Sequence, residues 1–78
     1  MSRYTIEKEK ELVAYGFDNT LGYFFDVFSL DEDGEIDKHI IEECSLITKA
    51  SNSKIAMLIE KYKGNPNHVD NVMLDLPI

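Results

Sequence analysis

The clearest pattern of apolar and polar positions in this chain lies between Val13 and Leu30, and it predicts a β-hairpin. Two runs rich in Val, Tyr and Phe, which favour strands, hold six of the eight aromatic residues. Between the runs, residues 18–22 (DNTLG) supply turn chemistry. Gly22 can adopt the positive φ that a short hairpin loop needs near its end.

The alternation along the two runs also predicts how the strands pair. Three cross-strand pairs would place six apolar side chains on one face of the hairpin. The pairs are Phe17 with Tyr23, Tyr15 with Phe25, and Val13 with Val27. A slip by one residue would bring Asp26 opposite Val13 and remove apolar area from that face, so we expect the first register.

The reverse face of the hairpin is not polar, because Leu12, Phe24, Phe28 and Leu30 point that way. Either other elements of the fold cover these side chains, or they form an exposed patch for a partner. Large exposed apolar patches on small proteins commonly mark such binding surfaces. The sequence leaves both alternatives open.

The regions on either side of the hairpin are less regular. Residues 4–11 (YTIEKEKE) alternate in charge and form either a lead-in or an extension of the first strand, which we expect from about Leu12. After the hairpin, Asp33-Gly34 predicts a tight turn. Apolar residues at helical spacing then predict a third strand or extended arm that runs into a helix within residues 36–47. These residues are Ile36, Ile40, Cys44 and Ile47.

The last third of the chain predicts helices. An apolar stripe at i, i+3, i+4 and i+7 indicates a helix from Lys54, capped by Ser51 or Ser53 and stopped by Gly64. The stripe consists of Ile55, Leu58, Ile59 and Tyr62. Asn65-Pro66 suits the start of a second helix over residues 66–76. A strand through Val72, Leu74 and Leu76 is the alternative.

These elements predict one domain, residues 1–78, of the α+β class. We expect a small antiparallel β-hairpin or three-stranded sheet with two or three short helices packed on it. No apolar run approaches 18 residues, and residues 1–11 are charged, so neither a membrane span nor a signal peptide is expected. Cys44 is the single cysteine, which excludes an internal disulfide and favours a cytoplasmic setting.

The charge is unevenly distributed. The chain carries a formal net charge of −7, and residues 26–43, the acidic segment, hold eight acids and one base. The rest of the chain is neutral, with seven acids and seven bases. The acids of the segment are Asp26, Asp31, Glu32, Asp33, Glu35, Asp37, Glu42 and Glu43. Direct nucleic-acid binding is disfavoured, because phosphate binding needs clustered Lys and Arg.

Residues 28–40 (FSLDEDGEIDKHI) resemble the calcium loop of EF-hand proteins. Asp31 and Asp33 match alternate ligand positions, Gly34 matches the sharp bend, and Asp37 follows at a ligand position. The first and last ligand positions, however, fall on Ser29 and Ile40. The resemblance therefore implies at most a weak calcium module, and an acidic β-turn is the preferred interpretation.

No catalytic, cofactor or metal site is specified. The chain contains no nucleophile-elbow pattern and no phosphate-binding glycine loop. His39 and Cys44 are too few donors for zinc, and His68 is distant in sequence. We therefore expect a protein that is not an enzyme.

The function expected from these observations is binding to a protein with a basic surface. The acidic segment would provide the charge, and Phe24, Phe28, Tyr15 and Tyr23 would provide apolar and hydroxyl contacts. In size and charge the chain is similar to the acidic inhibitors carried by phages and mobile elements, such as anti-CRISPR proteins and nucleic-acid mimics. The alternatives are the weak calcium module and an accessory subunit that forms a homodimer through the aromatic hairpin.

Overall fold

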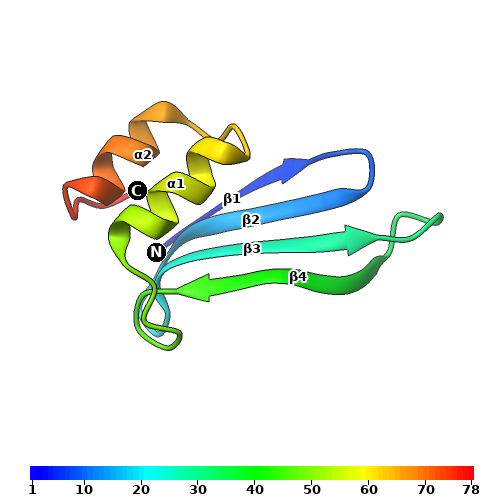
Figure 1. Cartoon of the computed structure of the whole chain (residues 1–78), viewed down its shortest axis with the longest axis horizontal. Coiled ribbons are helices and arrows are strands. Elements are labelled where there is room, and N and C mark those ends of the chain that lie inside the picture. Colours follow the sequence, from blue (N-terminus) through cyan, green and yellow to red (C-terminus); the bar gives the residue numbers. More distant parts are fainter.

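The computed structural model describes all residues, Met1–Ile78. Four antiparallel strands lie in the order β1-β2-β3-β4, and two helices follow them (Figure 1). The elements are β1 (Ser2–Glu7), β2 (Glu11–Asp18), β3 (Gly22–Leu30), β4 (Ile36–Cys44), α1 (Asn52–Lys61) and α2 (Pro66–Met73). The predicted α+β class is confirmed, with one strand more than the largest sheet expected and with two helices.

The predicted central hairpin, β2–β3, forms in the predicted register. Phe17 lies opposite Tyr23, and Tyr15 lies opposite Phe25. The Asp18 carboxylate accepts the Thr20 N–H at 2.7 Å, and Gly22 has φ +72°, so the loop uses the chemistry that its residues suggested. This pairing defines a first face of the sheet, which carries Tyr15 and Phe25, and a second, open face.

The first residues of the chain form a strand of their own. The Lys8 N–H donates to the Glu11 carbonyl at 2.8 Å and closes a tight turn between β1 and β2. Tyr4 lies opposite Tyr15 and Ile6 lies opposite Val13, so both side chains share the first face. The reversal itself was not predicted, because residues 8–10 contain no glycine, proline or asparagine to signal a turn.

The helix expected within residues 36–47 is wrong, because Ile36–Cys44 form β4. The pairing of β3 with β4 is irregular at two points, and the extra residues in β4 are Asp37 and Ile40. Each such bulge interrupts the two-residue alternation of a strand. The apolar residues of β4 are consequently spaced like a helical stripe although the backbone is extended.

Both helices in the last third of the chain are confirmed. The Ser51 hydroxyl accepts the Lys54 N–H at 3.2 Å at the start of α1, and the Asn65 side chain accepts the Asn67 N–H at 2.9 Å at the start of α2. The left-handed residue after α1 is Lys63, with φ 63°, rather than the expected Gly64. Gly64 serves a different purpose, which is close packing against its neighbours.

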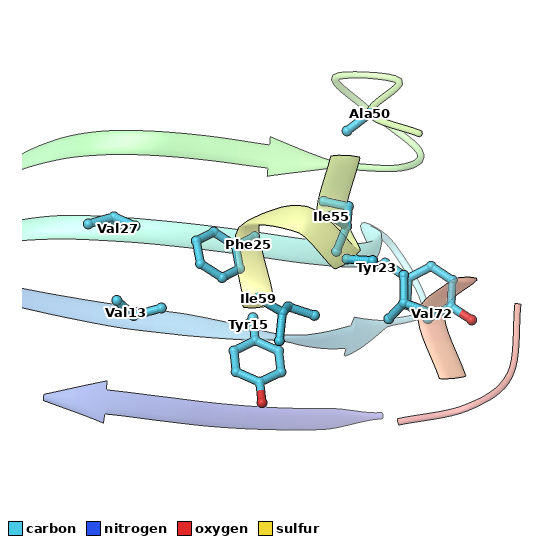
Figure 2. Packing of buried hydrophobic residues seen from close by; sticks show 10 residues of the cluster. Val13, Tyr15, Tyr23, Phe25, Val27, Ala50, Ile55, Ile59 and Val72 are labelled. Carbon is cyan, nitrogen blue, oxygen red and sulfur yellow. The ribbon is translucent and has the colours of Figure 1, made fainter. Parts of the chain in front are cut away.

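The core lies between the first face of the sheet and the two helices (Figure 2). Ile55 and Ile59 of α1 and Val72 of α2 are fully buried against aromatic and aliphatic side chains of β2 and β3. No helix lies on the open face, and the β3–β4 end of the sheet extends beyond both helices (Figure 1). The question that the sequence left open has a mixed answer: no helix covers the reverse face, but Phe24 is buried there and Leu12, Phe28 and Leu30 are half-buried.

Two buried tyrosines attach the C-terminal part of the chain to the sheet. The Tyr15 hydroxyl is hydrogen-bonded to His68 Nδ1 at 2.7 Å and accepts the Asn65 N–H at 3.3 Å. The Tyr23 hydroxyl donates to the Leu76 carbonyl at 2.7 Å. Burial raises the pKa of the Tyr15 hydroxyl, so it remains neutral across the ordinary pH range.

The structure has no helix with the length and apolar character needed to cross a membrane.

We predict that Gly64→Ala destabilises the fold, because the added Cβ would lie 2.6 Å from Ile59 Cγ2 and 3.0 Å from the Tyr15 hydroxyl. Overpacking of this kind costs about 1–3 kcal/mol of unfolding free energy, which urea denaturation measures. Gly34→Ala is the contrasting variant, since its Cβ would meet no atom and only its φ of +81° opposes the change. Equal stability of Gly64→Ala and the parent would contradict this account of the α1–sheet contact.

Candidate binding surface

The sheet divides the eight carboxylates of the acidic segment into three groups with different environments. Five belong to the β3–β4 hairpin end, two lie on the open face around His39, and one faces α1. The first group is Asp31, Glu32, Asp33, Glu35 and Asp37; the second is Asp26 and Glu42; the third is Glu43. All members of the first group are exposed, and none of them forms an ion pair.

The hairpin end, residues 30–40, is called the acidic arm below. Its turn is closed by two backbone hydrogen bonds, from Asp31 N–H to the Glu35 carbonyl at 2.8 Å and from Gly34 N–H to the Asp31 carbonyl at 3.0 Å. The Asp31 carboxylate also accepts the N–H groups of Asp33 and Glu35, each at 2.9 Å. Asp31 therefore shapes the turn as well as contributing charge.

All residues from Asp31 to Ile40 are exposed, and the arm lies at the end of the sheet that the helices leave uncovered (Figure 1). Ile36 and Ile40 are 56% and 52% exposed. The sequence had placed these two isoleucines among the apolar residues at helical spacing. The arm thus combines unpaired negative charge with two accessible apolar side chains, which is a composition suited to binding.

The second group of carboxylates is engaged by an imidazole. His39 Nε2 lies 3.1 Å from Asp26 Oδ1, and His39 Nδ1 lies 3.5 Å from Glu42 Oε2. The His39 ring also stacks on Phe28, with ring centroids 4.3 Å apart. Burial raises the pKa of Asp26, and the contact with His39 opposes this rise. This group links β4 to β3, and both of its carboxylates have a partner within the chain.

Glu43, the third group, points to the helix side of the sheet. It forms an ion pair with Lys54 of α1 and accepts a hydrogen bond from the Thr48 hydroxyl at 2.9 Å. The hydrogen bond from Lys54 and the one from Thr48 lower the pKa of Glu43. Its role in the structure is to join β4, the following loop and α1.

The open face carries a hollow of about 200 Å³ beside these groups. Phe24 and Cys44, opposite each other on β3 and β4, are both only 5% exposed. Ile47, which is 62% exposed, lines the hollow from the loop after β4. Phe24 is therefore covered by its neighbours, whereas Phe28 remains partly exposed next to His39.

The two tyrosines named from the sequence lie in the core rather than on a surface. Tyr15 and Tyr23 are 2% and 5% exposed, and their hydroxyls are used inside the molecule. Alternation alone placed their rings on the core face, but the sequence contained no signal that helix residues would satisfy the hydroxyls.

The loop that resembles an EF-hand lies between two strands, not between two helices. Asp31 already accepts two backbone N–H groups in it, and no group of three or more His, Cys, Asp or Glu side chains is arranged to hold a metal ion. The geometry of the loop is that of an acidic β-turn.

No protein-family model, curated protein or solved structure matches this chain. The interpretation of its surface therefore depends on the geometry and charge described above.

We predict opposite pH dependences for the two engaged carboxylates. The pKa of Glu43 is lowered from its ordinary value of 4.5, so its contribution to stability is present above that pH and is lost on acidification. The pKa of Asp26 is raised from 3.8, so its ionisation reduces stability as the pH increases above that value.

Thermal unfolding of Glu43→Gln and Asp26→Asn across pH 3 to 7 tests this expectation. The deficit of Glu43→Gln relative to the parent should shrink as the pH falls. The stability of the parent relative to Asp26→Asn should instead rise as the pH falls. Two parallel curves would show that neither carboxylate changes its pKa on folding.

We predict that Phe24→Ala reduces the unfolding free energy by about 3–5 kcal/mol, because a buried ring is removed from beside Cys44. Phe28→Ala should cost less, because this ring is only half-buried and contacts His39. Urea denaturation of both variants provides the measurement. A larger loss for Phe28→Ala would contradict the burial seen on the open face.

Proposed function

We propose that this chain is a non-enzymatic binding protein whose acidic arm occupies a basic surface of a partner protein. The observation that carries the proposal is the set of exposed, unpaired carboxylates at the end of the sheet beyond the helices. The other three acids of the segment have partners within the chain, so the arm is the principal source of free negative charge.

Electrostatics supports a protein partner of opposite charge. A concentrated negative field accelerates encounter with a basic surface, and it repels nucleic-acid phosphates. The Debye length is about 10 Å at 0.1 M salt, so the attraction acts at short range and weakens as the salt concentration increases. A partner that normally holds nucleic acid offers such a surface, which favours an inhibitor of nucleic-acid-handling machinery.

The two isoleucines of the arm supply apolar contact area, which the carboxylates do not provide. Ile36 and Ile40 together expose apolar surface beside the carboxylates. Burial of apolar area contributes about 25 cal/mol per Å², and it slows dissociation rather than accelerating association. In this proposal the carboxylates bring the partner to the arm, and the isoleucines retain it.

We predict that neutralising the turn abolishes most of this binding without unfolding the chain. The variant Asp31→Asn, Glu32→Gln, Asp33→Asn, Glu35→Gln changes the formal net charge from −7 to −3. The amide that replaces the Asp31 carboxylate retains an oxygen that can accept the two N–H groups of the turn. The partner protein is first isolated by affinity capture on the parent chain. Its association with the variant should slow by about tenfold or more at low salt, as surface plasmon resonance would measure.

The matched control removes four other exposed acids, with Glu7→Gln, Glu9→Gln, Glu60→Gln and Asp70→Asn, and it also reaches −3. It should bind as the parent does, because these acids lie outside the arm; Asp75→Asn replaces Glu7→Gln in a second control of the same charge that leaves β1 unchanged. An equal loss of binding in the turn variant and in the controls would show that the net charge, and not the position of the acids, controls binding. Unchanged binding by the turn variant would refute the proposed role of the arm.

A further inference from the structure

The outer edge of β1 is a regular, unpaired strand edge. Six consecutive residues, Ser2–Glu7, pair with β2 without irregularity. Because Lys8 N–H bonds to Glu11 at the turn, the alternation of an antiparallel ladder directs the backbone groups of Ile6 and Tyr4 toward β2. The N–H and C=O groups of Arg3, Thr5 and Glu7 therefore face away from the sheet, where a further strand can accept them.

The other edge of the sheet, β4, is protected against such pairing. Its two bulges disrupt the regular spacing of backbone groups. It also carries three acids and one base, Asp37, Glu42, Glu43 and Lys38, so a second copy of this edge would be repelled. β1 has no bulge and holds one base and one acid, Arg3 and Glu7. Only one of the two edges is thus open to association.

We propose that two copies of this chain pair through β1, antiparallel, with Thr5 on the two-fold axis. In this register Thr5 lies opposite Thr5 of the second copy, and Arg3 lies opposite Glu7 of the second copy. All three residues with outward backbone groups are then hydrogen-bonded, and the two sheets become continuous. With the axis on Tyr4 instead, Arg3 would lie opposite Thr5 and Glu7 would lose its partner.

The side chains of β1 are self-complementary in the same register. Arg3, Thr5 and Glu7 are exposed on the open face, where two symmetric Arg3–Glu7 ion pairs would form. On the first face, Tyr4 would lie opposite Ile6 of the second copy. Both residues are half-buried at the rim of the core, so pairing would cover their remaining apolar surface.

The strong negative charge of the chain does not oppose this arrangement. The turn between β1 and β2 lies beside the acidic arm, since the Leu30 N–H donates to the Lys10 carbonyl at 2.9 Å. Antiparallel pairing of β1 therefore directs the two arms to opposite ends of the dimer. The chain is 38 Å long, and separation on this scale exceeds the Debye length of about 10 Å at 0.1 M salt. The arm takes no part in the contact, so the dimer does not depend on the proposed function.

Sedimentation equilibrium and amide hydrogen exchange of the full chain test the dimer together. The mass should rise with concentration from 9.0 kDa toward twice that value. Over the same range the outward-facing amides of Arg3, Thr5 and Glu7 should become protected, whereas those of Tyr4 and Ile6 should be protected throughout.

Charge exchange across the axis provides the decisive variants. Arg3→Glu and Glu7→Arg should each weaken dimerisation by about tenfold or more, because like charges would lie opposite each other. The double variant, which keeps the net charge of −7, should restore it. Glu9→Arg is the control for charge, since Glu9 lies in the turn outside β1.

Thr5→Pro removes an N–H that faces outward, so it should block dimerisation and leave the monomer folded by circular dichroism. Thr5→Ala, which retains the N–H, should still dimerise. A chain that stays monomeric up to about 1 mM, the concentration at which even a millimolar Kd would be detected, overturns the proposal. The proposal is also overturned if the double variant does not restore dimerisation, or if a dimer forms while the β1 amides stay unprotected. Either result would indicate that the open face, and not β1, forms the contact.

Discussion

The contact between one side of α1 and the aromatic strip of β2 and β3 holds the other parts of this molecule in place. Ile55 and Ile59 are fully buried there against Tyr15 and Phe25. The sheet has helices on one face only, so this is where the two layers of the fold exclude water together. The position of α2 follows from it, because α2 packs on α1 and is linked by His68 to the Tyr15 hydroxyl.

The same contact determines which part of the sheet remains uncovered by the helices. The helices cover the part of the sheet that holds Tyr15 and Tyr23, and they end before the β3–β4 turn (Figure 1). Beyond α1, the hairpin is held by its own ladder, by the Asp31 turn and by the His39–Asp26 contact. The charge and the exposed isoleucines lie in this second region, separate from the core.

Sequence reasoning could predict the parts of the fold in which apolar residues recur at a constant spacing along the chain. The six apolar side chains at alternate positions of β2 and β3 specified their register, and the stripe from Ile55 to Tyr62 specified α1. A third strand after the turn at Gly34 was expected, but its later part was mistaken for a helix because two bulges converted the alternation into a spacing near that of a helical turn. β1 was missed as a separate strand because Lys8-Glu9-Lys10 turns without any residue that favours turns.

The candidate surface was predictable to the same limited extent. The clustering of acids is visible in the sequence, and so is the turn at Asp33-Gly34 that carries them. Their division into free and engaged carboxylates was not, since it depends on which side of β4 each residue faces after a bulge. Glu43 reaches Lys54 and Glu42 reaches His39 although the two acids are neighbours in sequence.

The separation of the arm from the core has an evolutionary consequence. Most substitutions in a core are purged because they lower stability, whereas exposed loop positions tolerate change. The exposed residues 32–33 and 35–38 lie outside the buried cluster, so mutation can alter their charge and shape at little cost to folding. If the arm binds a partner as proposed, selection can adapt it to a changing partner while the aromatic hairpin and its helices remain as they are.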